Sequence, residues 1–387
     1  MLNTLKKFLR RRKFTPLNTI YISKKRILDN YKYLANFKKG ISIAPVLKSN
    51  AYGHGLKEVG KILDCVGAPF FCVDSLYEAF QLNTHAKIET PILIMGYIHP
   101  KSLSIKKLPF SYAVYDIEHA RAINKYQSNA SVHVFVDTGM NREGVTMEEF
   151  PEFLKKLKRL ENIKVEGLMS HLAIPGKTHH PVTEEQIENY KKAKKMILEA
   201  GFKIKWFHLG GTYGLLNNLV EDCNLVRVGK AIFGVKNPNV RSENFKLKPT
   251  LIMTTKAVQI KDLSKGGSVG YDGTFEAKKD MKIAVLPMGY NDGLDRRLSN
   301  KGVVGVESFE GAGRKKIVFC KIIGLVSMNV ATIDISNVKN PKLDQTVIVY
   351  SDSESNPNSI SNASKLCGTI PYELLSHLSP ITKREVI

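Results

Sequence analysis

The sequence has few cysteines and no long apolar run. Its five cysteines are odd in number and none stands in a Cys-x-x-Cys pair, so neither a disulfide framework nor a zinc site is indicated. No window offers the uncharged apolar length that a membrane-spanning helix needs. We therefore expect a protein of the reducing cytoplasm that has no membrane partner.

Acidic residues are also scarce. The chain has 58 Lys and Arg against 36 Asp and Glu, a formal net charge of +22. Clustered basic residues bind nucleic acid by neutralising phosphates, but here they are spread along the chain without an RNA-binding aromatic motif or zinc-finger spacing. We expect a solvated basic surface and no nucleic-acid partner.

Residues 1–16 are basic, and their apolar residues are too interrupted to form a signal-peptide core. We therefore expect these residues to form a solvated extension.

The chain length favours two domains or a barrel with an addition, because 387 residues exceed what one core usually supports. Eight short runs rich in β-branched and aromatic residues read as strands, most of them separated by helical patterns. They lie at about 43–48, 70–74, 91–96, 112–116, 132–137, 164–170, 204–209 and 225–228. Eight such units are the count of a (β/α)8 barrel of the TIM type.

After residue 246 the pattern changes to strands separated by Gly or Asn, with no long helical stretch between them. The predicted fold class is therefore α/β plus all-β. We expect a barrel at 17–246 and a C-terminal β-strand domain at 247–387.

Functional side chains of such barrels lie at the C-terminal ends of the strands. Lys48 ends the first strand, where an ammonium without a partner is costly. Four further polar residues end or follow later strands, and Arg227 lies within the eighth strand. All five are expected to face the same pocket: Arg142, His171, His208, Thr212 and Arg227. The loops "GGTYG" and "RVGKA" offer small residues and backbone N–H groups where barrels hold phosphate. A lysine that faces a phosphate site suggests pyridoxal phosphate held covalently by the lysine amine.

Six motifs resemble those of alanine racemase, in order and over nearly the whole chain from about residue 17. They are "VLKSNAYGHG", "VDTGMNREG", "VRVGKAIFG", "GYDGTF", "PMGYNDG" and "GTIPYE". The resemblance implies a pyridoxal 5'-phosphate enzyme with a barrel and a β domain, working as a homodimer with shared active sites. It also implies interconversion of L-alanine and D-alanine, which supplies D-alanine for peptidoglycan.

The same resemblance implies roles for single residues. Lys48 would carry the cofactor and act as one base, and Tyr271 from the partner subunit would act as the other, since racemisation needs a base on each face of the substrate carbon. Arg227 would contact the pyridine nitrogen and leave it unprotonated, because arginine does not readily give up a proton. His208 would orient Arg227. Further cofactor contacts are implied for Tyr52, His171, Thr212, Gly229, Lys230 and Tyr372, and substrate contacts for Arg142, Met328 and Tyr290.

Three positions depart from the family pattern. Phe135 stands where many members have a lysine, often carbamylated, that pairs with the arginine matching Arg142. Asn329 replaces the usual aspartate, and Pro380 replaces an aromatic residue. We expect no carbamate in this chain, with Arg142 held by a chloride ion, a carbonyl or a carboxylate contributed elsewhere.

Alternatives remain open at this point. A broad-specificity, serine or lysine racemase of the same family would share the motifs, since pocket size depends on the loops. Decarboxylases with a barrel and a β domain use the same cofactor, but a glycine-rich phosphate loop and a nucleophilic cysteine motif would be expected, and "GTYG" with Cys223 does not match. A cofactor carrier would be a lone barrel, which the C-terminal domain argues against.

Overall fold

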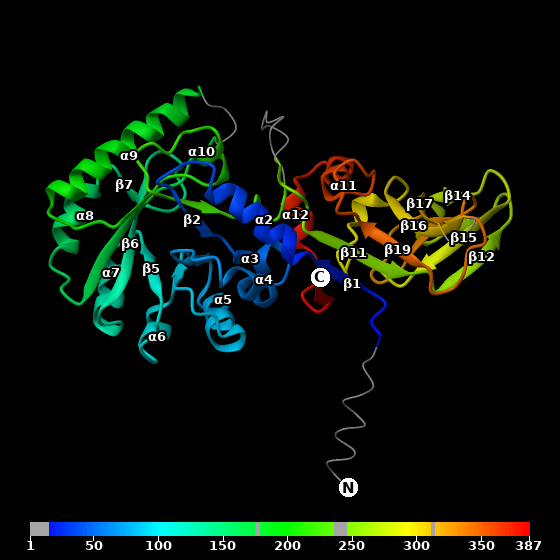
Figure 1. Cartoon of the computed structure of the whole chain (residues 1–387), viewed down its shortest axis with the longest axis horizontal. Coiled ribbons are helices and arrows are strands. Elements are labelled where there is room, and N and C mark those ends of the chain that lie inside the picture. Colours follow the sequence, from blue (N-terminus) through cyan, green and yellow to red (C-terminus); the bar gives the residue numbers. More distant parts are fainter. Residues whose placement is uncertain (1–14, 175–178, 236–245, 311–313) are drawn as a thin grey trace, which may run out of the picture. The chain divides into compact units, whose positions relative to one another are not determined.

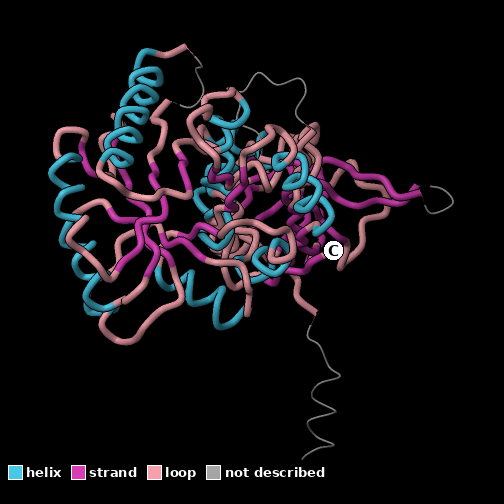
Figure 2. The backbone as a smooth tube through the Cα atoms, turned by 60° about the vertical axis from the view of Figure 1, so that its left-hand side comes forward, coloured by secondary structure: helices cyan, strands magenta, loops and turns pink. Residues whose placement is uncertain are grey.

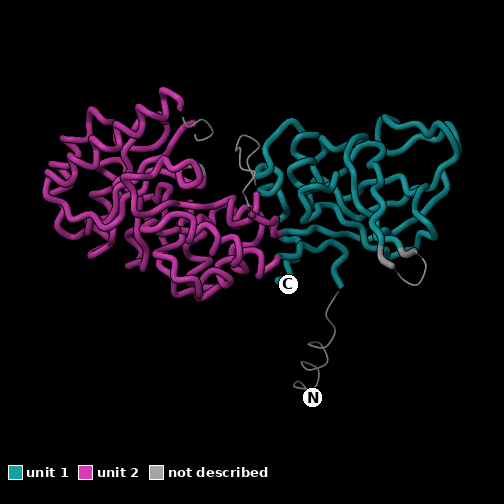
Figure 3. Tube along the Cα trace, turned by 45° about the horizontal axis from the view of Figure 1, so that its top comes forward, with its two compact units in different colours: residues 1–22, 251–387 teal, residues 23–250 magenta. Residues whose placement is uncertain are grey.

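The computed structural model describes residues 15–174, 179–235, 246–310 and 314–387 (Figure 1). The chain divides into two compact units, one of residues Ser23–Thr250 and one of Met1–Ile22 with Leu251–Ile387 (Figure 3). None of the helices in the described ranges is long and apolar enough to cross a membrane.

In the described part of the unit Ser23–Thr250, eight strands besides the two-residue strand β7 (Val145–Thr146) pair in parallel. Six lie in one sheet in the order β3-β4-β5-β6-β8-β9, and β10 pairs with β2. They are β2 (Ser42–Pro45), β3 (Phe71–Val73), β4 (Ile92–Ile94), β5 (Ser111–Val114), β6 (Ala130–Asp137), β8 (Ile163–Met169), β9 (Trp206–His208) and β10 (Leu225–Val228). A parallel bridge between Val46 and Cys72 links the β2 and β3 chains, and the Asn224 amide donates to the Phe207 carbonyl at 3.1 Å beside β9. All eight predicted strands are therefore present, and the predicted barrel class is confirmed.

Helices lie around these strands (Figure 2). They are α2 (Lys24–Ala35), α4 (Leu56–Leu63), α5 (Leu76–Phe80), α6 (Pro100–Leu103), α7 (Ile117–Tyr126), α8 (Phe150–Leu157), α9 (Pro181–Glu199) and α10 (Thr212–Leu216), with the two-residue strand β7 (Val145–Thr146) beside β6. Helix α9 ends as its sequence predicts. Gly201 has φ +85°, its amide donates to Leu198 and the Phe202 amide donates to Ile197. These two bonds satisfy carbonyls that the helix end would leave unpaired.

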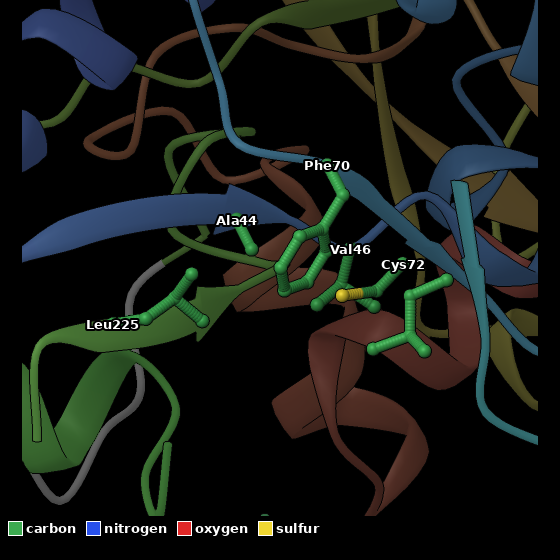
Figure 4. Packing of buried hydrophobic residues seen from close by; sticks show 6 residues of the cluster. Ala44, Val46, Phe70, Cys72 and Leu225 are labelled. Atoms are coloured by element: carbon green, nitrogen blue, oxygen red, sulfur yellow. The ribbon is translucent and has the colours of Figure 1, made fainter. Parts of the chain in front are cut away.

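The core beneath the strand ends is apolar. Figure 4 shows the Phe70 ring beside the side chains of Ala44, Val46 and Cys72, with Leu225 in the same cluster. Strands that are buried on both faces read as continuous apolar runs, which explains why the sequence pattern located them. This packing fixes β2 and β10, the strands that carry Lys48 and Arg227.

The other unit is built on a nine-stranded sheet in the order β12-β15-β18-β17-β16-β19-β11-β1-β20. Its strands are β1 (Thr19–Ile22), β11 (Leu251–Lys256), β12 (Gln259–Leu263), β15 (Met281–Leu286), β16 (Val303–Glu310), β17 (Arg314–Ile323), β18 (Ala331–Asp334), β19 (Thr346–Tyr350) and β20 (Lys383–Val386). A separate hairpin joins β13 (Ser268–Val269) to β14 (Phe275–Glu276), and the unit adds helices α11 (Ile360–Cys367) and α12 (Pro371–Ser376).

Strand β1 belongs to this sheet, although the sequence places the start of the barrel at residue 17. It pairs antiparallel with β11 and parallel with β20. The two short helices α11 and α12 also add to the strands expected after residue 246.

Candidate active site

Lys48 lies three residues after the end of strand β2, where the backbone changes hand. The next four residues, Ser49, Asn50, Ala51 and Tyr52, have φ of 52–54°. Left-handed backbone costs about 1–2 kcal/mol for each residue with a Cβ atom. Such strain persists only where the surroundings hold it, and it concentrates at functional sites.

Hydrogen bonds hold this left-handed turn from three directions. The Ser49 amide donates to Glu78 Oε1 at 2.6 Å, and Asn50 Oδ1 accepts from the Leu56 amide at 2.8 Å. The Gly53 amide closes the turn on the Ser49 carbonyl at 3.1 Å. The turn therefore sets the direction in which the Lys48 side chain leaves the strand.

The amine of Lys48 has a partner, as its position predicted. Its Nζ lies 3.4 Å from Oδ1 of Asp74, which directly follows β3, and 40% of the Lys48 side chain is exposed. The position of Lys48 in the sequence predicts such a partner without identifying it. The signal was present, because Asp74 is the first residue after the apolar strand "FCV" and β2 and β3 are neighbours.

Arg227 is a buried cation surrounded by neutral acceptors. Its NH1 group donates to Nδ1 of His208 at 2.7 Å and to the His208 carbonyl at 2.8 Å. Its NH2 group donates to the Ser170 carbonyl at 2.6 Å and to Nδ1 of His171 at 3.2 Å. Burial lowers the pKa of Arg227, and within the described chain no carboxylate forms an ion pair with it. The positive charge is thus fixed in direction and left available to a further acceptor.

The histidines around Arg227 are neutral at pH 7. Burial, followed by the charge of Arg227, lowers the pKa of His171 to about 3 and that of His208 well below its usual value. Because Nδ1 of His208 accepts from Arg227, its proton is on Nε2, which lies 2.8 Å from Nδ1 of His133. Burial also lowers the pKa of His133 to about 3. Arg227 is therefore oriented by His208, and His208 by His133.

His133 was missed by the sequence analysis. In "VHVFVD" it stands two residues before Phe135 and therefore on the same face of strand β6. A histidine buried within an apolar strand needs a hydrogen-bond partner, which was the available signal.

The loops after β9 and β10 form a close-packed cradle. A Cβ atom at Gly229 would collide with the Tyr52 hydroxyl and would lie 2.8 Å from the ring atoms Cε2 and Cζ, so Tyr52 rests on the Gly229 backbone. A Cβ atom at Gly211 would lie 3.2 Å from the Arg227 carbonyl. Burial lowers the pKa of Lys230, next in the chain, to about 8. Small residues, a phenol and backbone N–H groups converge here, as a phosphate requires.

Arg142 follows β6 in a loop built on Asp137. One oxygen of Asp137 accepts the amides of three following residues, Gly139, Met140 and Asn141. Nε of Arg142 lies 2.5 Å from Oε2 of Glu143, and about half of each side chain is exposed. The charge of Arg142 is among the causes that lower the pKa of His171.

Phe135 occupies an apolar environment close to this loop. It is 7% exposed and packs in one cluster with Ala113 and Met169. A charged group at this position would have to be buried among apolar side chains.

Four candidate residues lie in the C-terminal unit. Tyr271, Tyr290 and Met328 are 70%, 43% and 57% exposed. The Tyr290 amide donates to the Ser327 carbonyl at 3.0 Å, which joins the loop of Tyr290 to that of Met328. Tyr372 lies in the first turn of α12.

The structure brings several of the predicted barrel residues into contact. Hydrogen bonds join His171, His208 and Arg227, and contact joins Tyr52 to Gly229. A reactive amine, a fixed guanidinium and a phosphate cradle are the three features that hold pyridoxal phosphate, so the residues present fit this cofactor.

Comparison with known proteins gives a consistent result. Residues 22–237 match the model of the alanine racemase N-terminal domain, and residues 250–386 match that of the C-terminal domain. An alanine racemase of Syntrophobacter fumaroxidans is 30% identical over 340 residues, which cover 87% of this chain and 88% of that protein.

Solved structures agree. An alanine racemase of Clostridium difficile 630 has a TM-score of 0.86 at 27% identity and covers 97% of both chains. An alanine racemase of Bartonella henselae, solved with covalently bound pyridoxal phosphate, has a TM-score of 0.79 at 24% identity, covering 96% of this chain and 100% of that one, and supports the fold.

Proposed function

We propose a division of catalytic roles that starts from the fact that the chain belongs to the alanine racemase family. It is an isomerase that depends on pyridoxal 5'-phosphate and interconverts L-alanine and D-alanine. Lys48 and Tyr271 are the two bases of this reaction. Lys48 also binds the cofactor covalently.

The observation that carries the assignment is the fixed, buried charge of Arg227. Strand β10 pairs with β2, where Arg227 is opposite Ala44, so Arg227 and the end of β2 share one side of the barrel. Its acceptors in the described chain are neutral, and it keeps its protons. Such a group donates to a ring nitrogen without protonating it. Bound pyridoxal phosphate supplies the electron withdrawal that makes the α-proton of an amino acid removable.

The phosphate is held by the cradle at the ends of β9 and β10. Thr212 supplies a hydroxyl, Gly229 and Lys230 supply backbone N–H groups, and Tyr52 supplies its phenol. Tyr372 is a further phosphate contact. His171 and His208 support the site through Arg227.

The second base comes from another copy of the chain. A racemase takes a proton from one face of the α-carbon and returns one to the other face, so two bases must approach from opposite sides. Tyr271 is 70% exposed and stands on the C-terminal unit with Tyr290 and Met328, also exposed. This exposure supports a homodimer in which each active site is completed by the partner's Tyr271.

The substrate carboxylate is bound by Arg142, with Met328 and Tyr290 beside it. A guanidinium needs an anion to hold its orientation when no substrate is present. Glu143 provides this anion, and Phe135 has no amine on which a carbamate could form.

The enzyme acts in the cytoplasm and supplies D-alanine for peptidoglycan. Cysteines without disulfide bonds support the first statement, since Cys65, Cys72, Cys223, Cys320 and Cys367 are free thiols. A broader substrate range within the family is the alternative to strict alanine specificity.

The roles are tested with labelled cofactor and a panel of L-amino acids. Borohydride reduction should attach the cofactor to the peptide that contains Lys48, and Lys48→Ala should lose this label and the activity. The exposed Lys57→Ala, on α4, serves as the matched control. Label on any other peptide would overturn the assignment of Lys48.

Tyr271→Phe should still bind the cofactor but should lose about 10²–10⁴-fold in α-proton exchange from one enantiomer, the one whose proton this base removes. Mixed dimers of Tyr271→Phe and Lys48→Ala chains should recover activity, because one of the two sites in such a dimer is intact. Equal small losses for both enantiomers would show that Tyr271 has a structural role. Absence of recovery would argue against shared sites.

A further inference from the structure

Tyr271 depends on its turn for its position. Its side chain makes no hydrogen bond within the described chain, and 70% of it is exposed. The residue opens a short 3₁₀ turn, Tyr271–Gly273, at the tip of the β13–β14 hairpin. The hairpin has two paired positions, and two backbone hydrogen bonds of Ala277, to Gly266 and Gly267, continue the pairing away from the turn.

The backbone of this turn is strained. Gly270, Asp272 and Gly273 have φ of 73°, 59° and 52°, in the left-handed region. Glycine adopts this region freely, but the non-glycine residue pays a steric penalty. A backbone in such a sparsely populated conformation persists only where contacts with neighbouring groups hold it in place.

Asn300 bonds directly to the residue that follows the turn and is linked through Gly324 to the strand that precedes it. Its Nδ2 donates to Oγ1 of Thr274 at 3.0 Å, and Thr274 directly follows the turn. Its Oδ1 accepts from the Gly324 amide at 2.7 Å. Gly324 in turn lies against Val269, because a Cβ atom on Gly324 would be 2.6 Å from the Val269 carbonyl. One amide side chain therefore braces the strand that enters the turn and the residue that leaves it.

Asn300 is itself held in place. It has φ +59°, a conformation that asparagine tolerates better than most residues. The preceding residue, Ser299, accepts the Val326 amide at 3.0 Å and donates to the Arg296 carbonyl at 2.6 Å. The brace is thus anchored on two segments of the unit.

We propose that Asn300 is a positioning residue for Tyr271. The proposal rests on the proposed function, in which Tyr271 is one of the two bases. Proton transfer needs the phenol within hydrogen-bond reach of the substrate proton, about 2.6–3.2 Å. A displacement of about 1 Å can cost about 10²-fold in rate. Loss of the brace weakens this base and leaves the one on Lys48 intact.

The test uses substitutions that respect the left-handed backbone. Asn300→Gly removes the amide without adding strain, and Asn340→Gly is the matched control at another exposed left-handed asparagine of the same unit, φ +47°. Asn300→Asp is the conservative variant. Its carboxylate accepts from the Gly324 amide and from the hydroxyl of Thr274, so the brace is retained.

Two measurements are made on each variant. The first is solvent exchange of the α-proton from each alanine enantiomer by the holoenzyme. We expect Asn300→Gly to lose about 10-fold for the enantiomer served by Tyr271 and less than about 3-fold for the other. The second is hydrogen–deuterium exchange of the amides at 268–276 in cofactor-free protein, which should become faster in Asn300→Gly and stay unchanged in Asn340→Gly and Asn300→Asp.

The outcomes separate this proposal from the one it rests on. If Tyr271→Phe shows the one-sided loss and Asn300→Gly matches the control, Tyr271 is a base and the role of Asn300 is refuted. If Asn300→Gly slows α-proton exchange equally for both enantiomers, the role of Asn300 is structural and the proposal is refuted. If Tyr271→Phe shows no one-sided loss, the proposed function fails and the role of Asn300 fails with it. Adding Asn300→Gly to Tyr271→Phe should cost nothing further, since both act on the same base.

Discussion

Replacing Gly167 by alanine tests the histidine network beneath Arg227. Gly167 on β8 is paired in register with His133 on β6. A Cβ atom at Gly167 would overlap the His133 imidazole, lying 2.7 Å from Cγ and 2.8 Å from Cε1. Carbon atoms make their best contact at about 3.5–4.0 Å, so the ring must move by about 1 Å or the strands must separate.

The ring has little room to move. His133 is 1% exposed, its Nδ1 lies 2.8 Å from His208, and the Phe70 ring is centred 5.2 Å from the imidazole. Overpacking of this kind costs about 1–3 kcal/mol. Breaking the hydrogen bond to His208 leaves buried polar groups unpaired, which lowers the free energy of unfolding by about a further 1–3 kcal/mol. Alanine regains only about 0.5–1 kcal/mol of strand stability over glycine, so the net loss is about 1–5 kcal/mol.

Urea unfolding measures this loss as a change in the free energy of unfolding. The matched partner is His133→Ala, which removes the ring that the new methyl group strikes. In a double-mutant cycle the loss of Gly167→Ala/His133→Ala should be smaller than the sum of the single losses by at least about 1 kcal/mol. Additive losses, or a Gly167→Ala variant within about 0.5 kcal/mol of the parent, would refute the argument that His133 is confined.

Three further predictions concern charge and the cradle. Burial lowers the pKa of His133 and of His171 to about 3, so between pH 6.5 and about 3 these histidines bind protons in the unfolded chain but not in the folded one. The free energy of unfolding, measured by urea titration, should therefore drop by about 2 kcal/mol per histidine between pH 7 and pH 5. Glu143→Gln should raise the KM for alanine by up to about 5-fold, the value of a half-exposed ion pair, and should change nothing in an Arg142→Ala background. Gly229→Ala should weaken cofactor binding by about 10-fold or more in fluorescence titrations, because the methyl group displaces the phenol above it.

Much of the barrel was predictable because its strands are short apolar runs with both faces buried. Lys48 and Arg227 could be assigned to one pocket because each ends or lies in a strand whose C-terminal end faces the mouth. To predict the contact between Lys48 and Asp74, one must know which strands are neighbours in the barrel. The sequence of a single strand does not give this information. His133 was overlooked because a single histidine in a strand is usually a satisfied core residue, and its partner stands 75 positions away.

The placement of β1 shows a different limit. The segment "TIYI" has the composition of a strand, but its residues do not indicate which sheet the strand joins. Its partner β11 begins at Leu251, beyond the whole barrel sequence, so only the folded chain brings the two together. Strand type follows from local pattern, whereas sheet membership follows from contacts that are distant in sequence.

Arg142, which we propose binds the substrate carboxylate, illustrates why the details of a site are hard to predict from sequence. Phe135 indicated that a carbamate is absent and left a chloride, a carbonyl or a carboxylate to hold Arg142. A residue next in sequence is a poor candidate on pattern alone, because adjacent side chains of an extended chain point to opposite sides. The loop removes that objection: Asp137 gathers three successive amides and Asn141 adopts φ +56°, so Arg142 can turn back onto Glu143. We therefore propose that the neighbouring Glu143 supplies the anion that holds Arg142, and activity should be indifferent to added bicarbonate.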